Sequence, residues 1–476
     1  MKIHFFLLFI VALVSCTNIN YKLLGNNMVL QRDSPYTKIW GVSDSQVVNI
    51  GLLRDGKLAD SYDTKVIGKK WVINLKPYPS SGPYQIVVKT DETVSYDNVM
   101  FGDVYLCSGQ SNMEMSVKLT DNSTAEIADS INYPNLRLFH VKHNQQDKPQ
   151  DNVEGEWVQS SPSGLGGDWE AGFSAACYYF GREVYKSLDG KIPIGLIESN
   201  WGGTLVEAWM SPEALKACND TIRGDGPNDQ SHLWNGQIVP LLNYNIKAAL
   251  WYQGEANVDF GGAQLYKCSF PSMITDWRKN WNIGNFPFYF VQLAGYAPQA
   301  ERWSQLRLAQ IEATKLSNVY FATAMDIGDP TDIHPRNKQE VGRRLSLIAR
   351  NQIYGQPIAY KGPTLNSATV TFSQDGHLAF VNLNIDNVVG ELLQFKTNKC
   401  TRCCSVGTLF SVVTNSRGAV APLDVSVKGN RIVLFVERTS RDEVVRSVRY
   451  AMDAYAECVY RDGSTGLPMN TFEFQV

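Results

Sequence analysis

The chain has 476 residues, of which 44% are hydrophobic and 19% charged, and its formal net charge is −3. This length allows two or three domains and a core large enough to hold a rigid site. So small a net charge provides no strong field of one sign, which argues against nucleic acid or an anionic membrane surface as a partner.

Residues 1–16 are typical of a secretory signal peptide. Lys2 supplies a positive charge, residues 5–13 form an apolar run, and residues 14–16 are a small-residue exit. The run is too short to span a membrane, and no later segment is long and apolar enough to do so. We therefore predict a secreted or lysosomal protein. Residues 13–16 also resemble a bacterial lipoprotein box, and in that alternative Cys16 is lipidated at the mature N-terminus.

Two stretches of the chain have a β pattern. Residues 17–100 contain short strand-like runs separated by Gly, Asp and Pro turns, and they predict a small region resembling a β-sandwich. Residues 356–476 return to this pattern and predict a C-terminal β-rich region. The pattern leaves open whether the two regions pack together as one accessory domain.

Between them, residues 101–355 alternate apolar strand-like runs with helical stretches, as in a parallel sheet covered by helices. A helix is expected after Pro335, because proline is common at the start of helices. The fold class is therefore α/β with flanking β-rich segments. The predicted strands of the sheet are residues 104–107, 194–198, 248–253, 288–293 and 319–325.

Eight cysteines follow Cys16, an even number that favours disulfides in an oxidising compartment, although their pairing cannot be derived from the sequence. Cys400, Cys403 and Cys404 lie close together without a second Cys or His pair at ligand spacing, so we expect no metal site. The sequons that begin at Asn122 and Asn219 fit a glycosylated exported protein.

Polar or glycine-rich loops follow four of the predicted strands. Because the carboxyl ends of parallel strands meet at one edge of a sheet, where loops line a crevice, we expect these loops to form the site. Together they contain a serine, glycines, amide side chains, acids and a histidine. The loops are residues 108–113, 200–204, 254–257 and 326–334.

Ser111 and His334 are the predicted nucleophile and base. A serine hydroxyl needs an adjacent base, usually a histidine oriented by a carboxylate. Ser111 lies two residues after Gly109, in a segment without the second glycine of the α/β-hydrolase elbow, and its alternative role is that of a helix N-cap. Of the five histidines after residue 16, only His334 combines a strand-end loop, a following helix and nearby acids.

At these residues the chain resembles the sialate O-acetylesterases, in blocks that follow the same order along residues 25–475. The resemblance implies the SGNH-hydrolase class, whose core is a flavodoxin-like three-layer α/β/α sandwich. It also implies a serine esterase that hydrolyses O-acetyl groups of sialic acid, free or glycan-linked, through an acetyl-enzyme and without a cofactor. The matching blocks are residues 102–113, 193–209, 251–257 and 333–339.

The resemblance implies a role for each residue of these loops. The backbone N–H of Ser111 and that of Gly202 or Gly203 would hold the oxyanion. The broader class uses an Asn side chain as third donor; here Gln253 stands at the strand end and Asn257 four residues on, and we predict Gln253. The class has its acid three residues before the histidine, a position that is Thr331 here, so we predict Asp332, with Asp329 or a backbone carbonyl as alternatives.

Three competing interpretations accompany this one. An acetylesterase of another carbohydrate, such as xylan, would use the same chemistry. A carbohydrate-binding protein without catalysis would keep an aromatic cleft, for which Trp201, Trp209 and Trp251 are candidates, with core packing as their alternative role. A retaining glycosidase would need a matched pair of carboxylates, chosen from Glu198, Glu207 and Glu255, and Glu255 is better explained as orienting neighbouring loop groups.

Overall fold

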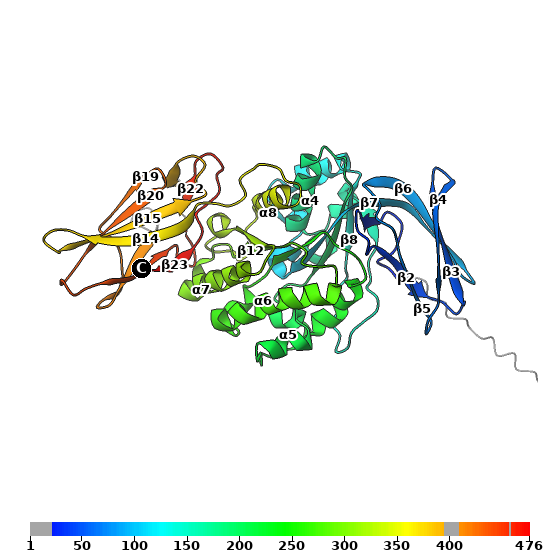
Figure 1. Ribbon diagram of the computed structural model, residues 1–476, viewed down its shortest axis with the longest axis horizontal. Coiled ribbons are helices and arrows are strands. Elements are labelled where there is room, and N and C mark those ends of the chain that lie inside the picture. The colour runs from blue at the N-terminus through cyan, green and yellow to red at the C-terminus, as the bar shows by residue number, and fades with distance from the viewer. Residues whose placement is uncertain (1–20, 395–408, 457) are drawn as a thin grey trace, which may run out of the picture.

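The structure is a computed structural model that describes residues 21–394, 409–456 and 458–476. The predicted signal peptide and Cys400, Cys403 and Cys404 lie outside these residues. Three β-rich or mixed regions follow one another along the longest axis of the molecule, with the mixed α/β region in the middle (Figure 1). The described parts of the two β-rich regions lie at opposite ends, so they do not pack together as one accessory domain.

The N-terminal region is a twisted antiparallel arrangement that shares its core with the middle region. Along β3 every second side chain is buried, among them Val48, Ile50 and Leu52, as expected for a strand with one face on a core. The strands are β1 (Val29–Gln31), β2 (Lys38–Val42), β3 (Val47–Arg54), β4 (Lys57–Lys65), β5 (Lys70–Asn74) and β6 (Ser81–Lys89).

One long strand, β7 (Thr93–Gly109), joins this region to the central sheet. Its first half pairs antiparallel with β6, and from Asp103 onward it pairs parallel with two strands of the middle region. The predicted strand at residues 104–107 is thus the buried end of a longer element. Because β7 is continuous, it connects the N-terminal region rigidly to the loop that begins at Gln110.

The predicted parallel sheet is confirmed. Its order is β13-β12-β11-β7-β10-β8-β9, and every neighbouring pair is parallel except β8 with β9. All five predicted strands are present, and three of them end one or two residues earlier than predicted. Besides β7, the strands of this sheet are β8 (Leu136–His140), β9 (Trp157–Gln159), β10 (Ile194–Asn200), β11 (Ala248–Tyr252), β12 (Phe288–Gln292) and β13 (Val319–Thr323).

Helices cover this sheet in two groups, seen above and below it in Figure 1. In one group α4 and α8 pack closely against each other. Gly342 of α8 permits this contact, because a Cβ at this position would lie only 2.6 Å from the backbone nitrogen of Phe180 in α4. The other group contains α5, α6 and α7. The α-helices are α1 (Ser111–Glu114), α2 (Ser123–Asp129), α3 (Pro162–Leu165), α4 (Ala175–Ser187), α5 (Pro212–Ala217), α6 (Gly262–Trp281), α7 (Ala300–Ile311) and α8 (Lys338–Gln352).

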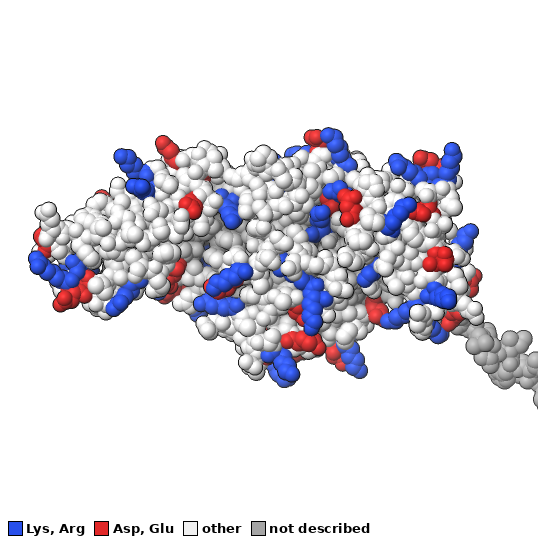
Figure 2. Space-filling model, in the orientation of Figure 1, with Lys and Arg blue, Asp and Glu red and all other residues white. Residues whose placement is uncertain are grey.

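The helix expected after Pro335 is α8, and Asn337 caps it by accepting the N–H of Glu340 at 3.2 Å. In the part of the chain that the structure covers, we find no helix with the length and apolar character of a membrane span. Positive and negative side chains are interspersed over the face shown in Figure 2, as the small net charge predicts.

The C-terminal region has its own apolar core, which includes Val381, Leu383, Ile432 and Leu434. Its main sheets are antiparallel, in the orders β14-β15-β20-β19 and β18-β17-β21-β23. The strands are β14 (Thr364–Phe372), β15 (Leu378–Asp386), β16 (Leu392–Gln394), β17 (Phe410–Thr414), β18 (Gly418–Val420), β19 (Asp424–Lys428), β20 (Arg431–Glu437), β21 (Val445–Tyr450), β22 (Tyr460–Asp462) and β23 (Phe472–Gln475).

Candidate active site

Ser111 is the first residue of α1, and only Gln110 separates it from the carboxyl end of β7. The turn before it requires glycine: Gly109 has φ +144°, and a Cβ there would lie 2.2 Å from the carbonyl oxygen of Tyr252. The side chain of Gln110 accepts the N–H groups of Gly254 and Ala256, both at 3.2 Å. The serine loop is therefore attached to the loop after β11.

Gly202 lies directly against the serine. A Cβ at Gly202 would stand 3.4 Å from Cβ of Ser111 and 2.8 Å from Oε2 of Glu114. The N–H of Gly202, one of the two predicted second oxyanion donors, is donated to this carboxylate oxygen at 2.5 Å. Gly203 has φ +72°, and nothing lies within 4 Å of the place where its Cβ would be. Glu114 was missed by sequence reasoning, although it lies one helical turn after Ser111.

The loop of His334 meets the loop of Ser111 through Asn112. The amide of Asn112 donates to the carbonyl of Ile333 at 2.9 Å, which joins the residue after the serine to the residue before the histidine. The imidazole is half-buried, and the ring of Trp169 stands edge-on to it with centroids 5.0 Å apart. The structure thus brings together two loops that are more than two hundred residues apart in the chain.

The predicted triad acid, Asp332, lies beside the histidine but bonds mainly to its backbone. Oδ1 of Asp332 accepts the N–H of His334 at 2.8 Å and is 3.8 Å from its Nδ1. Oδ1 of Asp329 accepts the N–H groups of Thr331 and Asp332 and so shapes the turn. Burial lowers the pKa of His334, and the charge of Lys338 lowers it further, whereas the carboxylates of Asp332 and Glu114 raise it.

Gln253 and Asn257 are buried beneath the glycine loop. Gln253 donates to the carbonyl of Thr204 at 3.0 Å and to Oδ1 of Asn257 at 2.6 Å, and its own Oε1 accepts from Tyr266 at 2.9 Å. Asn257 accepts the N–H of Val206 at 3.0 Å. Both donors of the Gln253 amide are thus already engaged, so in this conformation the side chain supports the loop; its predicted role toward the oxyanion stays a prediction.

A buried polar cluster supports both catalytic loops from below. Asn112 donates to Oε1 of Glu255 at 2.6 Å and accepts from Nζ of Lys338 at 2.8 Å. Lys338 also donates to the carbonyl of Pro335 at 2.6 Å. Burial lowers the pKa of Lys338 to about 7 and raises that of Glu255 to about 7. The sequence suggested the orienting role of Glu255, whereas sequence reasoning gave no role to Lys338, although this residue lies in the matching block 333–339.

His143 and Trp201 form an aromatic pair next to the glycine loop, and two carboxylates lie beside it. His143 stacks on Trp201 with ring centroids 4.1 Å apart and an interplanar angle of 5°. Its Nε2 lies 3.3 Å from Oε1 of Glu114, and its Nδ1 lies 3.3 Å from Oε2 of Glu170. Of the three tryptophans considered for a cleft wall, Trp201 is half-buried here.

The other two, Trp209 and Trp251, have no exposed surface, so core packing is their role. They stand edge to face, with ring centroids 5.9 Å apart. Glu198 and Glu207, which a glycosidase interpretation would need, are also buried. Burial raises the pKa of Glu198 to about 8 and that of Glu207 to about 7.

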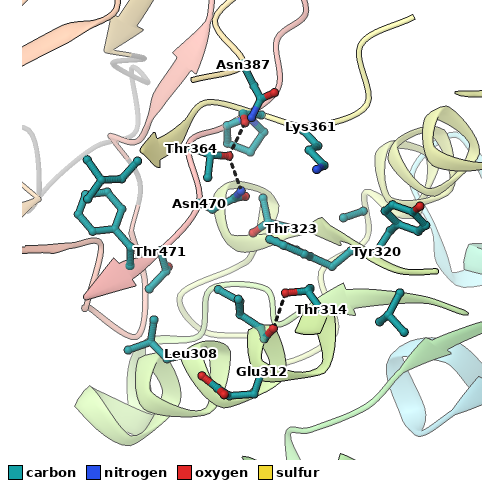
Figure 3. A pocket seen from close by; sticks show the side chains of 18 of the residues that line it. Leu308, Glu312, Thr314, Tyr320, Thr323, Lys361, Thr364, Asn387, Asn470 and Thr471 are labelled. Atoms are coloured by element: carbon teal, nitrogen blue, oxygen red, sulfur yellow. Dashed lines mark hydrogen bonds between the residues drawn. The ribbon is translucent and has the colours of Figure 1, made fainter. Parts of the chain in front are cut away.

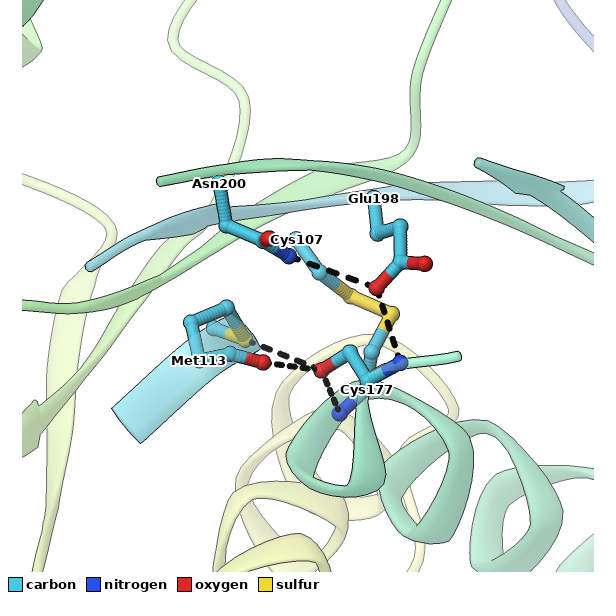
Figure 4. The surroundings of a disulfide bond; sticks show 6 residues. Cys107, Met113, Cys177, Glu198 and Asn200 are labelled. Atoms are coloured by element: carbon cyan, nitrogen blue, oxygen red, sulfur yellow. Dashed lines mark hydrogen bonds between the residues drawn. A yellow bond between two sulfur atoms is a disulfide. The ribbon is translucent and has the colours of Figure 1, made fainter. Parts of the chain in front are cut away.

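Disulfides were expected without a pairing, and the structure contains Cys107–Cys177 and Cys218–Cys268. The first joins the end of β7, four residues before Ser111, to the first turn of α4 (Figure 4). Next to it, Oε2 of Glu198 accepts the N–H of Ser174 at 2.8 Å and a weaker bond from Asn200 at 3.3 Å. This covalent and polar support holds the two strand ends that carry the serine and glycine loops.

The loop of His334 is also anchored to the C-terminal region. The carboxylate of Asp326, fully buried at the start of this loop, accepts from Arg344 at 2.6 and 2.9 Å and from Arg461 of β22 at 2.6 Å. Although burial opposes it, the charge of Arg344 holds the pKa of Asp326 below its usual value. Among the described residues, we find no cluster of three or more His, Cys, Asp or Glu side chains that could hold a metal ion.

Comparison with known proteins adds to this geometry. Residues 101–349 match a family described as carbohydrate esterase, sialic acid-specific acetylesterase. A sialate O-acetylesterase from Pongo abelii is 32% identical over 94% of this chain and 91% of its own. The Homo sapiens sialate O-acetylesterase is 33% identical, covering 80% of this chain and 79% of its own. A solved carbohydrate acetylesterase from Xanthomonas citri superposes with a TM-score of 0.81 at 29% identity, over 95% of this chain and 98% of that one.

Proposed function

Because this chain belongs to the sialic acid-specific acetylesterase family of carbohydrate esterases, and so is a carboxylic ester hydrolase, we propose that Ser111 and His334 remove O-acetyl groups from sialic acid. The single observation that carries this assignment is the Asn112–Ile333 hydrogen bond, which joins the serine loop to the histidine loop at the carboxyl edge of the sheet. The substrate, free or glycan-linked, follows from the family and from the names of the relatives.

In the proposed mechanism, Oγ of Ser111 attacks the acetyl carbonyl while His334 takes its proton. The tetrahedral intermediate collapses, and His334 returns the proton to the departing sugar oxygen. Water, activated by the same imidazole, then attacks the acetyl-enzyme and releases acetate. Asp332 stabilises the imidazolium that forms in both halves, which its negative charge 3.8 Å from Nδ1 supports.

For the oxyanion we propose the N–H of Ser111 and that of the glycine pair. Glu114 already accepts the N–H of Gly202. A carboxylate there would repel a developing negative charge, and among the described residues no acceptor holds the N–H of Gly203, which favours Gly203 as the second donor. Gln253 and Asn257 remain candidates for a third donor if a bound substrate rearranges their amide pair.

The finer description of the fold is likewise a proposal. The order β10-β7-β11-β12-β13 becomes 2-1-3-4-5 when these strands are numbered along the chain, with β8 and β9 added outside β10. This order supports a flavodoxin-like three-layer core of the SGNH-hydrolase class at residues 101–355. We retain residues 1–16 as signal peptide, 17–100 and 356–476 as flanking regions, and export as the destination; the asparagines of both sequons are exposed, as glycosylation would need.

The substrate is tested by acetate release from O-acetylated sialic acid and, in parallel, from acetylated xylan. We expect kcat/KM to be higher on the sialic acid. Equal or faster release from xylan would instead support the alternative that the enzyme acts on another acetylated carbohydrate. A protein that binds either sugar and releases no acetate from any ester would contradict the esterase assignment itself.

The pH dependence tests His334 as base. A base must be neutral, and burial lowers the pKa of His334, so kcat/KM should rise with pH through a limb centred below the ordinary histidine value of 6.5. Because the charge of Asp332 raises this pKa, Asp332→Asn should move the limb to still lower pH while also reducing the plateau. A profile that is flat from about pH 4 to 8 would exclude a histidine base.

A further inference from the structure

A cavity lies away from the catalytic residues, between the central sheet and the C-terminal region (Figure 3). Its volume is about 780 Å³, within the range of small-molecule sites. β13 and the segment after α7 form one wall, and residues 360–365 with the chain near β23 form the other. Arg344, which pairs with Asp326 at the start of the His334 loop, lines the cavity, whereas Ser111, Gly202, Gly203 and His334 do not.

The lining combines hydroxyl and amide groups with aromatic rings. Thr364, Asn387 and Asn470 contribute polar groups. The hydroxyl of Thr364 donates to the carbonyl of Gly362 at 2.9 Å and accepts a long bond of 3.5 Å from the amide of Asn470, so this amide retains capacity for a ligand. Tyr320 and Tyr360 are half-buried, with ring centroids 6.0 Å apart at 80°. Amides that meet hydroxyl groups, together with rings that meet C–H faces, suit a sugar better than a purely apolar ligand.

The lining contains three cations, Lys267, Arg344 and Lys361, and two carboxylates, and Arg344 is already paired with Asp326 and Glu340. Lys361 lies over the ring of Tyr360 at 5.5 Å, and no carboxylate of the described residues pairs with it or with Lys267. The two acids of the lining already have cationic partners: Glu312 pairs with Lys315 at 2.5 Å, and Glu473 pairs with Arg449 at 3.1 Å. A ligand with a carboxylate would therefore find unpaired cations and little repulsion.

We propose that this cavity is a second carbohydrate site, separate from the acetyl-cleaving site, that binds an oligosaccharide bearing a carboxylate. The identification of the acid as sialic acid rests on the proposed function, whereas the carbohydrate character rests on the lining alone. Such a site would hold the glycan on which acetylated residues are presented, and would lower KM for glycan-linked substrate without acting on the bond that is cleaved.

The test measures binding of 3′-sialyllactose and of lactose by calorimetry to the full protein, after an organophosphonate has blocked Ser111. We expect sialyllactose to bind and lactose to bind more weakly. Lys361→Ala should weaken the binding of sialyllactose about tenfold, as expected for the loss of one charge-assisted hydrogen bond. Asn387→Ala should weaken the binding of both ligands. Both side chains are exposed, so neither change should disturb folding. Lys57→Ala, at the other end of the molecule, is the matched control.

Hydrolysis of 4-nitrophenyl acetate should be unchanged in all three variants, because none of them touches the serine site. Unchanged sialyllactose affinity in Lys361→Ala and Asn387→Ala, or no binding to the blocked wild type, would overturn the proposal. Its failure is distinguishable from failure of the proposed function, because acetate release from O-acetylated sialic acid is measured separately on the unblocked enzyme.

Discussion

Ser111→Ala should lower kcat for acetate release by a factor on the order of 10⁴ or more, because the change removes the only atom that can form the acetyl-enzyme. The backbone N–H groups that hold the oxyanion remain, so a small residual rate above that in water is expected. The loss should be the same for O-acetylated sialic acid and for 4-nitrophenyl acetate, since both require the same attack on an acetyl carbonyl.

The fold should be unaffected by this substitution. In the described part of the chain, no hydrogen bond involves Oγ of Ser111, and the bond from the N–H of Met115 to the carbonyl of Ser111 does not depend on the side chain. Thermal unfolding of Ser111→Ala should therefore match that of the wild type. Ser317→Ala, an exposed serine before β13, provides a control with full activity. Turnover by Ser111→Ala within tenfold of the wild type would rule out the nucleophile assignment.

Asn112→Ala is expected to cause the second largest loss, in both stability and rate. The change removes the partner of two buried charged groups, Lys338 and Glu255, and the bond to Ile333. Leaving buried charged groups without their hydrogen bonds costs about 3 kcal/mol of unfolding free energy. Because the bond to Ile333 joins the two catalytic loops, we also expect kcat to fall on the order of 10²-fold, as for a displacement of about 1 Å between reacting groups.

A double-mutant cycle tests whether the loss of stability in Asn112→Ala comes from its bond with Lys338. Lys338→Met removes the buried cation, and its effect on unfolding free energy, measured by urea denaturation, should not add to that of Asn112→Ala because the two residues share one bond. The rate loss should fall on kcat while KM changes little, since the Asn112 amide contacts protein groups and not the cleft. Additive free energies, or a kcat within threefold of the wild type, would contradict the positioning role of Asn112.

Local patterns were enough to predict the elements. Five strands of the central sheet, the helix after Pro335 and the β-rich ends follow from apolar periodicity and from turn residues, which act over a few neighbouring positions. The length of β7 was not predicted, because the sequence places a region boundary between residues 100 and 101, and only the pairing partners of β7 reveal that one strand serves two sheets. Sequence periodicity does not record which strands pair.

The same division holds for the site. That a serine, a glycine pair and a histidine follow strand ends was visible in the sequence, since loops at the carboxyl edge of a parallel sheet converge whatever their length. The side chains that lie between those loops were not visible in the sequence. Glu114 on the N–H of Gly202, and Lys338 on Asn112, depend on contacts across 88 and 226 residues.

By itself, then, the sequence determined the order of elements, the family and the loops that carry the chemistry, because these depend on residue type and near-neighbour spacing. Tertiary structure alone decided that Gln253 and Asn257 lie buried with their amides engaged, and that Asp332 bonds first to a backbone N–H. The physical reason is that hydrogen-bond partners and burial are set by packing between distant segments, and a polar side chain looks the same in sequence whether it faces the cleft or supports the loop beneath it.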